Sequence, residues 1–319
     1  MSRYARQELV IGTQAQRALA QAHVLVVGAG GLGSPVLQYL CGAGVGDITI
    51  VDHDHVEESN LHRQPLYRLE DIGRPKAIAA CEHLRAANPY PRLHPQVYRL
   101  SPTTAKMAIS QADVVIDAAD SFAVSYILSD LCLAAGLPLI SASVLGQTGY
   151  VGGYCGSAPS IRAVFPDLPS TAGSCAQNGV LGPVVGMVGT TQAQMALAYL
   201  SGQDPTPLGR LLTLDAKNFG FGGFDFSGAE EPEAAIGFVD ASALSHGDQL
   251  IELRSEQESP TPFAPQARRV LPQDIQTTQL DPNSRVVLAC QTGLRAWHAG
   301  QALQTMGFGD IALFAQSAS

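Results

Sequence analysis

Three glycines near the start of the chain, Gly28, Gly30 and Gly33, have G-x-G-x-x-G spacing. They follow the apolar run Val24–Val27, which favours a strand, and lead into the stretch Leu32–Ala43, which favours a helix. Glycines at such a turn let the backbone approach a phosphate, and the helix start offers free N–H groups and a partial positive charge. The pattern therefore predicts a nucleotide-binding loop rather than an ordinary tight turn.

Further residues that suit a nucleotide follow other apolar runs. Asp52 ends the run Ile48–Val51, at about the 20-residue separation expected of a ribose-binding carboxylate. Asp120 follows the run Val114–Ile116. Between them lie another carboxylate, two amides and two cations, namely Asp54, Asn60, Gln64, Arg63 and Lys76. Cations neutralise phosphate oxygens and a carboxylate can hold Mg²⁺, so this set favours ATP. NAD is the alternative, but no histidine stands out as the acid–base residue of an oxidoreductase.

Two of the six cysteines lie where a thiol could react. Cys175 lies in the glycine-rich segment TAGSCAQNG, and a cationic phosphate site beside it would favour a thiolate. Cys290 follows the run Val286–Ala289 and begins CQTGLRA. Backbone N–H groups at a helix start, together with Arg295, would favour a thiolate or persulfide anion there. An inert structural thiol is the alternative at both positions.

Strands and helices alternate along the segments expected to position these residues. After the first strand and helix, strands are predicted at Ile48–Val51, Val114–Ile116 and Leu137–Ala142, and helices at Lys76–Ala87, Phe122–Ala135 and Val184–Tyr199. This alternation predicts an α/β fold with a doubly wound, Rossmann-like and mostly parallel sheet. Later strands, expected at Tyr150–Cys155, Leu211–Leu214 and Phe219–Phe226, suggest an antiparallel extension.

The composition changes over residues 227–236, which begin SGAEEPEAA and have the small, acidic character of a linker. We expect a nucleotide-binding domain over 1–226 and a small α/β domain over 237–319. In the second domain, Gln249–Leu253 and Val286–Ala289 are predicted strands and Arg295–Met306 a helix.

The composition also excludes several classes of partner. A formal net charge of −9 disfavours a phosphate backbone, so we expect no nucleic acid. No apolar run approaches the roughly 20 residues that span a bilayer, and the N-terminal stretch MSRYARQELV lacks a signal-peptide core. Six scattered cysteines do not suggest a disulfide framework. These features predict a cytoplasmic protein with reduced thiols and no membrane partner.

Five segments, in order, resemble the ThiF/MoeB/HesA family of ubiquitin-activating-enzyme-like adenylyltransferases. They are RYARQ, VVGAGGLGSPVLQYLCGAGVGDITIVDHDHV, SNLHRQ, GRPKA and GVLGPVVGMVG. The resemblance spans about residues 3–226. It implies ATP as the nucleotide and a ubiquitin-like sulfur-carrier protein as the partner. The carrier's C-terminal glycine carboxylate would attack the α-phosphate, giving an acyl-adenylate and pyrophosphate.

The same resemblance assigns roles to individual positions. The loop residues Gly28, Gly30, Gly31 and Gly33 would line the nucleotide pocket, together with Asp52 at the ribose and Asp54 beside it. The phosphates would be contacted by Asn60, Arg63 and Lys76, and Asp120 would position Mg²⁺. Arg6 would reach into the ATP site of a partner subunit, which implies a homodimer. Cys175 would attack the adenylate or form a covalent link with the carrier.

The C-terminal domain resembles rhodanese-like sulfurtransferases over about residues 237–315. The resemblance rests on Cys290, Gly293 and Arg295, and on Glu252 and Arg254 in LIELRSEQE. It implies that Cys290 carries sulfur as a persulfide, loaded by a donor such as a cysteine desulfurase. Transfer of that sulfur to the carrier would give a thiocarboxylate. Gln291 stands where an arginine is frequent, so a docking or regulatory domain is the alternative.

The chain departs from the family at two places. Family members commonly carry two C-x-x-C zinc pairs, but Ser160 and Ala163 stand at the first and no cysteine follows the strand at Leu211–Asp215. We therefore expect no structural zinc. After Asp120, the family's Asn, Arg and Asn are replaced by Ser121, Ser125 and Ser129. Serine cannot replace the charge and forked donor of an arginine. A scaffold that binds nucleotide and carrier without adenylation is thus the alternative function.

Overall fold

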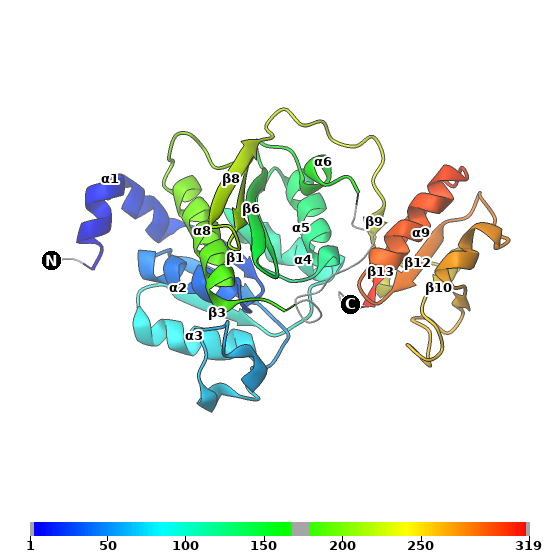
Figure 1. The fold of residues 1–319 in the computed structure, drawn as a ribbon, viewed down its shortest axis with the longest axis horizontal. Helices are drawn as coiled ribbons and strands as arrows, with labels where there is room; N and C mark the ends of the chain where they lie inside the picture. The colour runs from blue at the N-terminus through cyan, green and yellow to red at the C-terminus, as the bar shows by residue number, and fades with distance from the viewer. Residues whose placement is uncertain (1–2, 168–178, 317–319) are drawn as a thin grey trace.

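The computed structural model describes residues 3–167 and 179–316, which form two α/β parts, each around its own sheet (Figure 1). The larger sheet has eight strands in the order β3-β2-β1-β4-β5-β6-β7-β8. Its first five strands in that order run parallel, and each later strand pairs antiparallel with its neighbour. The predicted doubly wound sheet with an antiparallel extension is confirmed.

The strands of the larger sheet follow the apolar runs closely. They are β1 (His23–Val27), β2 (Asp47–Val51), β3 (Arg92–Gln96), β4 (Val114–Asp117), β5 (Pro138–Leu145), β6 (Thr148–Cys155), β7 (Arg210–Asp215) and β8 (Gly220–Asp225). Strand β3, with the sequence RLHPQ, was not expected from its polar composition. It forms one edge of the sheet, where a proline without an N–H is tolerated.

Helices cover both faces of this sheet because its strands alternate their side chains. Val24 and Val26 of β1 pack in one core with α2 (Gly33–Ala43), α3 (Lys76–Ala87) and α8 (Gly182–Leu200). Leu25 and Val27 face the opposite core, with α4 (Pro102–Ala108) and α5 (Phe122–Ala135). Two apolar faces per strand are what a buried parallel sheet requires.

Two further helices complete this part of the chain. Helix α1 (Ala5–Gln21) precedes β1, departs from helical geometry at Gly12 and extends from the body in Figure 1. Helix α6 (Ile161–Val164) follows β6. Among the described helices, none combines the length and hydropathy needed to cross a membrane.

The second sheet has five parallel strands in the order β11-β10-β12-β13-β9. These are β9 (Gly237–Phe238), β10 (Gln249–Glu252), β11 (Arg268–Arg269), β12 (Val286–Cys290) and β13 (Ile311–Ala315). Helix α9 (Leu294–Thr305) follows β12 and packs on β12 and β13. The predicted small α/β unit is confirmed, with a parallel arrangement that places Cys290 at the carboxyl end of β12.

Candidate functional site

The glycine loop joins β1 to α2 in a conformation that excludes larger side chains. Gly28 has φ +97° and donates its N–H to the carbonyl oxygen of Val51 at 2.9 Å. A Cβ on Gly28 would lie 2.6 Å from the oxygen of Ala118, and one on Gly33 only 2.0 Å from the oxygen of Gly28. A Cβ on Gly31 would lie 2.8 Å from Val185 of α8. Glycine at these positions therefore lets the loop pass close to its neighbours.

Asp52 follows directly after β2 and contacts the glycine loop. Its carboxylate accepts one hydrogen bond from the N–H of Ala29 at 2.7 Å and another from the N–H of Asp54 at 2.8 Å. Burial raises the pKa of the Asp52 carboxyl, while the Lys76 ammonium and the two N–H donors act in the opposite direction. Tyr67 holds the other side of Ala29, because its hydroxyl donates to the Ala29 carbonyl oxygen at 2.7 Å.

Lys76 lies at the first position of α3, with its side chain buried beside the loop. Its Nζ contacts Asp54 Oδ2 at 3.1 Å. Burial raises the pKa of the Asp54 carboxyl, but the charge and hydrogen bond of Lys76, together with the charges of His53 and Arg99, leave that pKa below its ordinary value. Tyr67 also donates to the carbonyl oxygen of Lys76 at 3.3 Å. The predicted residues Asp52, Asp54 and Lys76 are thus joined in one network.

The segment after Asp54 turns back towards the glycine loop through a short 3-10 helix over Glu58–Asn60. Asn60 is buried and accepts from the N–H of Glu57 at 3.3 Å, while the Arg63 guanidinium donates to the oxygen of Ser59 at 3.0 Å. Gln64 is buried, and its Oε1 has no hydrogen-bond partner among the described residues. Its Nε2 lies 3.6 Å from where a Cβ of Gly30 would be. This buried amide oxygen is therefore an unsatisfied acceptor beside the glycine loop.

Asp120 reaches the same sheet edge from β4. Strands β1 and β4 are parallel, with Val27 opposite Asp117, so the turn that carries exposed Asp120 follows β4 beside the glycine loop. Asp117 is fully buried, and its carboxylate accepts from Ser141 Oγ at 2.7 Å and from the Ala119 N–H at 3.2 Å. Burial raises the pKa of Asp117 to about 6.

Three residues that sequence reasoning did not assign to this site support it. Asp117 holds the Asp120 turn, Tyr67 holds the glycine loop, and Gln192 of α8 donates from Nε2 to the carbonyl oxygens of Asp117 at 2.6 Å and Ile140 at 3.0 Å. None lies in a motif that signals chemistry. Their only sequence signal is a polar group placed within an otherwise apolar segment.

Asp52, His53 and Asp54 bring potential metal-ligand atoms within 4.8 Å of one another in the described part of the chain. Several of these atoms are already engaged, since both Asp52 oxygens accept backbone hydrogen bonds and Asp54 contacts Lys76 and His53. The described contacts of these three residues therefore stabilise the loop and do not by themselves indicate a metal site.

Arg6, another predicted site residue, lies away from this loop. Arg6 is exposed on α1, two residues from Tyr4, whose ring packs against Gly44 at the end of α2. The glycine loop is at the opposite end of that helix, about 16 Å away at 1.5 Å per residue. Arg6 therefore does not join the loop of its own chain. Cys175 lies in residues 168–178, outside the described residues.

The second predicted site is the turn between β12 and α9. The Cys290 thiol is buried, and its Sγ accepts from the N–H of Gly293 at 3.2 Å and of Ala296 at 3.4 Å. Gly293 has φ +87°, which closes the turn onto the sulfur. Backbone donors therefore surround Cys290, as the sequence predicted.

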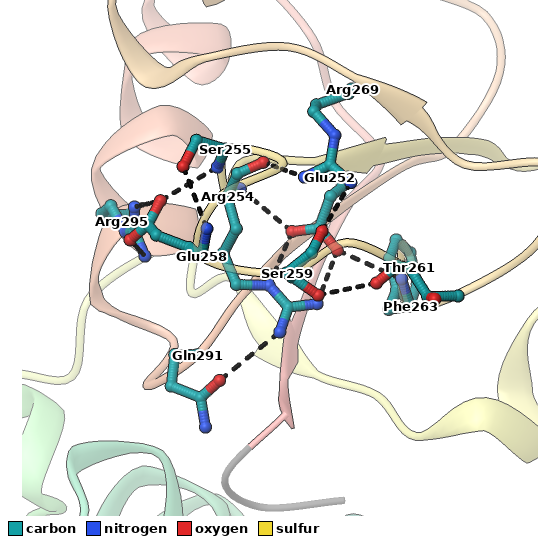
Figure 2. Close-up of polar contacts among 10 residues, drawn as sticks. All are labelled: Glu252, Arg254, Ser255, Glu258, Ser259, Thr261, Phe263, Arg269, Gln291 and Arg295. Atoms are coloured by element: carbon teal, nitrogen blue, oxygen red, sulfur yellow. Dashed lines mark hydrogen bonds and ion pairs between the residues drawn. The ribbon is translucent and has the colours of Figure 1, made fainter.

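Two ion pairs hold the segments around this turn (Figure 2). The buried Arg254 guanidinium contacts the Glu252 carboxylate at 2.8 and 2.6 Å and donates to Gln291 Oε1 at 3.4 Å. Arg295 contacts Glu258 at 3.0 and 2.9 Å and lowers the pKa of that carboxyl to about 2. Arg254 is thus engaged by the carboxylate of the last residue of β10, and Arg295 by a carboxylate on the loop that follows β10.

The positions where the chain departs from its expected family have other structural roles. Ser160 donates from its N–H and its Oγ to Glu231 at 2.6 Å each. Ser129 is buried and its Oγ accepts from the N–H of Ile161 at 3.0 Å, while Ser125 donates to the oxygen of Ser121 at 3.3 Å. The buried Ser121 Oγ has no partner among the described residues.

A doubly wound sheet with a glycine loop, and polar residues at the carboxyl ends of its strands, defines a nucleotide-binding α/β protein. Residues 4–233 match the ThiF family model, so the chain belongs to the ThiF family.

Individual relatives match over about two thirds of the chain. "Adenylyltransferase and sulfurtransferase UBA4" of Yarrowia lipolytica is 42% identical over 225 residues, covering 68% of this chain and 56% of the relative. "Adenylyltransferase and sulfurtransferase MOCS3" of Bos taurus is 44% identical over 219 residues, covering 67% and 48%. The chain thus spans about half the length of these relatives. "SAMP-activating enzyme E1" of Haloferax volcanii is 37% identical over 225 residues, covering 69% and 83%.

Solved structures share the fold at lower identity. Microcin C7 biosynthetic enzyme MccB, in complex with N-formylated MccA, superposes with a TM-score of 0.65 at 20% identity. The match covers 73% of this chain and 74% of that one. PaaA superposes with a TM-score of 0.60 at 21% identity, covering 70% and 72%.

Proposed function

We propose that this protein uses ATP to adenylate the C-terminal Gly-Gly carboxylate of a ubiquitin-like sulfur-carrier protein, and then supplies sulfur from Cys290. The observation that carries the proposal is the network at one sheet edge, where Asp52 holds the glycine loop through Ala29 and Asp54 through its own N–H, and where Asp54 pairs with Lys76. Membership of the ThiF family and relatives named adenylyltransferase and sulfurtransferase support it.

The residues at this edge fit a nucleotide. A Cβ on Gly28, Gly31 or Gly33 would collide with neighbouring atoms. Glycine at such a turn lets the backbone approach a phosphate at the start of a helix. The orphaned Oε1 of Gln64 offers an acceptor beside the loop. Asp52 would accept from the ribose. Family membership makes ATP the nucleotide we propose, in place of NAD.

The chain's own cations would stabilise the charge that builds up in the reaction. When the carrier carboxylate attacks the α-phosphate, negative charge grows on the phosphate oxygens and on the leaving pyrophosphate. Lys76 is positioned for this by Asp54, and Arg63 would leave the Ser59 carbonyl to bind phosphate. Asn60 would orient the same phosphates. Asp120 would hold Mg²⁺, which would neutralise part of the phosphate charge.

The sulfur step would use the Cys290 turn. Backbone donors at Gly293 and Ala296 would stabilise a sulfur anion at Cys290, and Arg295 adds positive charge nearby. A persulfide donor such as a cysteine desulfurase would load the cysteine. Residues 1–226 would form the adenylyltransferase domain and 237–319 the sulfurtransferase domain, joined by 227–236.

Arg6 would act in the site of a second copy, giving a homodimer. Leu9 and Val10 lie beside it on α1 and are 87% and 84% exposed. Such exposed apolar side chains on a projecting helix favour burial against another surface. Sedimentation analysis tests this, with a dimer expected for the wild type and a shift to monomer for the Leu9→Asp variant.

The experiment that tests the function is intact-mass spectrometry of the carrier. Purified protein is incubated with ATP, Mg²⁺, a persulfide donor and a panel of carriers that end in Gly-Gly. The proposal predicts replacement of one carboxylate oxygen by sulfur on a cognate carrier, and no product from the Cys290→Ser variant. Product formed by that variant at the wild-type rate would exclude the sulfur step.

A nucleotide- and carrier-binding scaffold is the second candidate. Ser125 favours it, because a neutral hydroxyl that bonds the oxygen of Ser121 and the Asp117 carboxylate stands where the family places an arginine. Binding of ATP and carrier without release of pyrophosphate would support the scaffold, and turnover of ATP to AMP would eliminate it.

A further inference from the structure

The turn that carries Cys290 rests on the first turn of α5, the helix that follows Asp120. A Cβ on Gly293 would lie 3.5 Å from the Cβ of Ala123 and 2.6 Å from the Phe238 ring. Ala123 is the second residue of α5 and stands three positions after Asp120. The candidate sulfur site and the candidate adenylation site of one chain are therefore neighbours, with the second sheet beside α4 and α5 (Figure 1).

This contact belongs to a continuous hydrophobic core. One cluster of buried residues runs from Leu25 and Val115 of the larger sheet through Ala123 to Leu288 and Cys290 of the second sheet. A tethered, freely moving unit would instead have its own closed core, separate from that of its neighbour. The two sheets thus behave as parts of one body around α5.

Polar contacts fasten β9, the strand that carries Phe238, on both of its flanks. Just before β9, the oxygen of Ile236 accepts from Arg162 Nη2 at 3.1 Å, and the same guanidinium contacts Asp130 of α5 at 2.6 and 2.8 Å. Just after β9, the buried Asp240 carboxylate accepts from two groups at the start of α4, Ser101 Oγ at 3.2 Å and the Thr103 N–H at 3.1 Å. These bonds keep Phe238, and with it Gly293, against α5.

We infer that Cys290 delivers sulfur to the adenylate formed in its own chain, and that Asp240 is a positioning residue for this transfer. The inference rests on the proposed function, and it adds a route: sulfur passes within one polypeptide, from the β12–α9 turn across the first turn of α5 to the carboxylate activated beside Asp120.

The chemistry of the step is an acyl transfer. The terminal sulfur of the Cys290 persulfide attacks the acyl carbon of the adenylate, a C–S bond forms, and the bond from that carbon to the AMP oxygen breaks. AMP leaves with the electron pair, and the carrier is held as an acyl disulfide on Cys290. A small thiol then attacks Sγ of Cys290, breaks the S–S bond and releases the thiocarboxylate. A second thiol returns Cys290 to the thiol and is itself oxidised to a disulfide.

Two defective full-length chains distinguish transfer within a chain from transfer between chains. One carries Asp120→Asn and keeps Cys290, and the other carries Cys290→Ser and keeps Asp120. The chains are co-expressed with different tags, and mixed assemblies are isolated by both tags. Thiocarboxylate formation is measured by mass spectrometry, and pyrophosphate exchange is measured in every sample.

Transfer within one chain predicts that the mixed assemblies form no more thiocarboxylate than either variant alone, while the wild type is active. Restored product in the mixture, at a quarter or more of the wild-type rate, would overturn the inference and leave the proposed function intact. A wild type without exchange or without thiocarboxylate would overturn both, so the two failures are distinguishable.

Asp240 provides a second, independent test. Asp240→Ala should lower the rate of thiocarboxylate formation about tenfold and leave pyrophosphate exchange unchanged, because only the seating of β9 is lost. Asp240→Asn keeps an acceptor for the Thr103 N–H and should recover most of the rate. Asp281→Ala, in an exposed turn of the same sheet, is the matched control. Equal rates for Asp240→Ala and the wild type, or a parallel loss of exchange, would contradict the positioning role.

Discussion

Gly33 approaches Gly28 so closely that a Cβ on Gly33 would lie 2.0 Å from the Gly28 carbonyl oxygen. Gly33→Ala should therefore push the glycine loop away from the start of α2, with a loss of several kcal/mol of stability, as expected of overpacking against backbone. Gly42 is the matched control, because it lies in the same helix and an added Cβ there meets nothing within 4 Å.

Urea unfolding and ATP affinity measure both effects. Gly42→Ala should be neutral or stabilise the protein by up to about 1 kcal/mol, since alanine is the better helix former. Wild-type stability and ATP affinity in Gly33→Ala would show that the loop accommodates the added methyl group and that the close contact between Gly33 and Gly28 is not required.

The hydroxyl of Tyr67 joins the glycine loop to the start of α3 through the carbonyl oxygens of Ala29 and Lys76. Tyr67→Phe should lower the free energy of unfolding by about 1 kcal/mol, which is the typical net value of a hydrogen bond. The KM for ATP should rise several-fold because the loop loses a restraint. Tyr90→Phe, at a position that is 72% exposed, should change neither quantity. An unchanged KM in Tyr67→Phe would rule out a role in the nucleotide site.

The buried carboxyl of Asp117 predicts a pH-dependent stability. Its folded-state pKa of about 6 lies above the unfolded value of 3.8, so the folded protein retains a proton that the unfolded chain releases. Wild-type stability should therefore fall as the pH rises between these two values. In Asp117→Asn, whose amide can still accept from the Ala119 N–H and donate to Ser141, this loss is absent.

The difference in unfolding free energy between Asp117→Asn and the wild type should thus grow by about 2 kcal/mol from about pH 4.5 to about pH 7. Urea unfolding of both proteins across this range measures it. A difference that stays constant, or that shrinks as the pH rises, would contradict the assigned burial of an ionisable carboxyl.

Two ion pairs near Cys290 differ in burial and should differ in strength. Removing one partner of the buried Glu252–Arg254 pair leaves an uncompensated charge, so Glu252→Gln should cost about 3–5 kcal/mol. The Glu258–Arg295 side chains are 47% and 37% exposed, and Glu258→Gln should cost no more than about 1 kcal/mol. Thermal unfolding of the two variants compares them directly. Equal losses would mean that the Glu252–Arg254 pair is open to water in solution.

Local patterns were sufficient to predict the elements that carry the site. The helices at Lys76–Ala87 and Phe122–Ala135 begin and end where proline, glycine and apolar spacing indicated, and β1 follows its apolar run. Strand β3 and helix α4 were missed. Strand β3 is polar and pairs on one side only, so tertiary pairing rather than local preference determines it.

The candidate site was predictable where one short segment contains both the motif and its partner. Glycine spacing and Asp52 fall within a single strand–helix–strand unit, and their contact through Ala29 follows from that unit. The supports from Tyr67 and Gln192, and the packing of Gly293 on Ala123, join segments that are far apart in the sequence. The hydrophobic periodicity of a single segment carries no information on contacts with distant segments, so these contacts become visible only in the folded structure.

The most direct test of the proposed function is ATP–pyrophosphate exchange with a panel of carriers ending in Gly-Gly. The wild type is compared with Asp120→Asn and with a control, Asp113→Asn. Asp113 directly precedes the first residue of β4, whereas Asp120 follows the last. We predict exchange that requires a carrier, falls roughly 100-fold in Asp120→Asn and persists in Asp113→Asn. Bound ATP without exchange for any carrier, or full exchange in Asp120→Asn, would contradict the proposed adenylation.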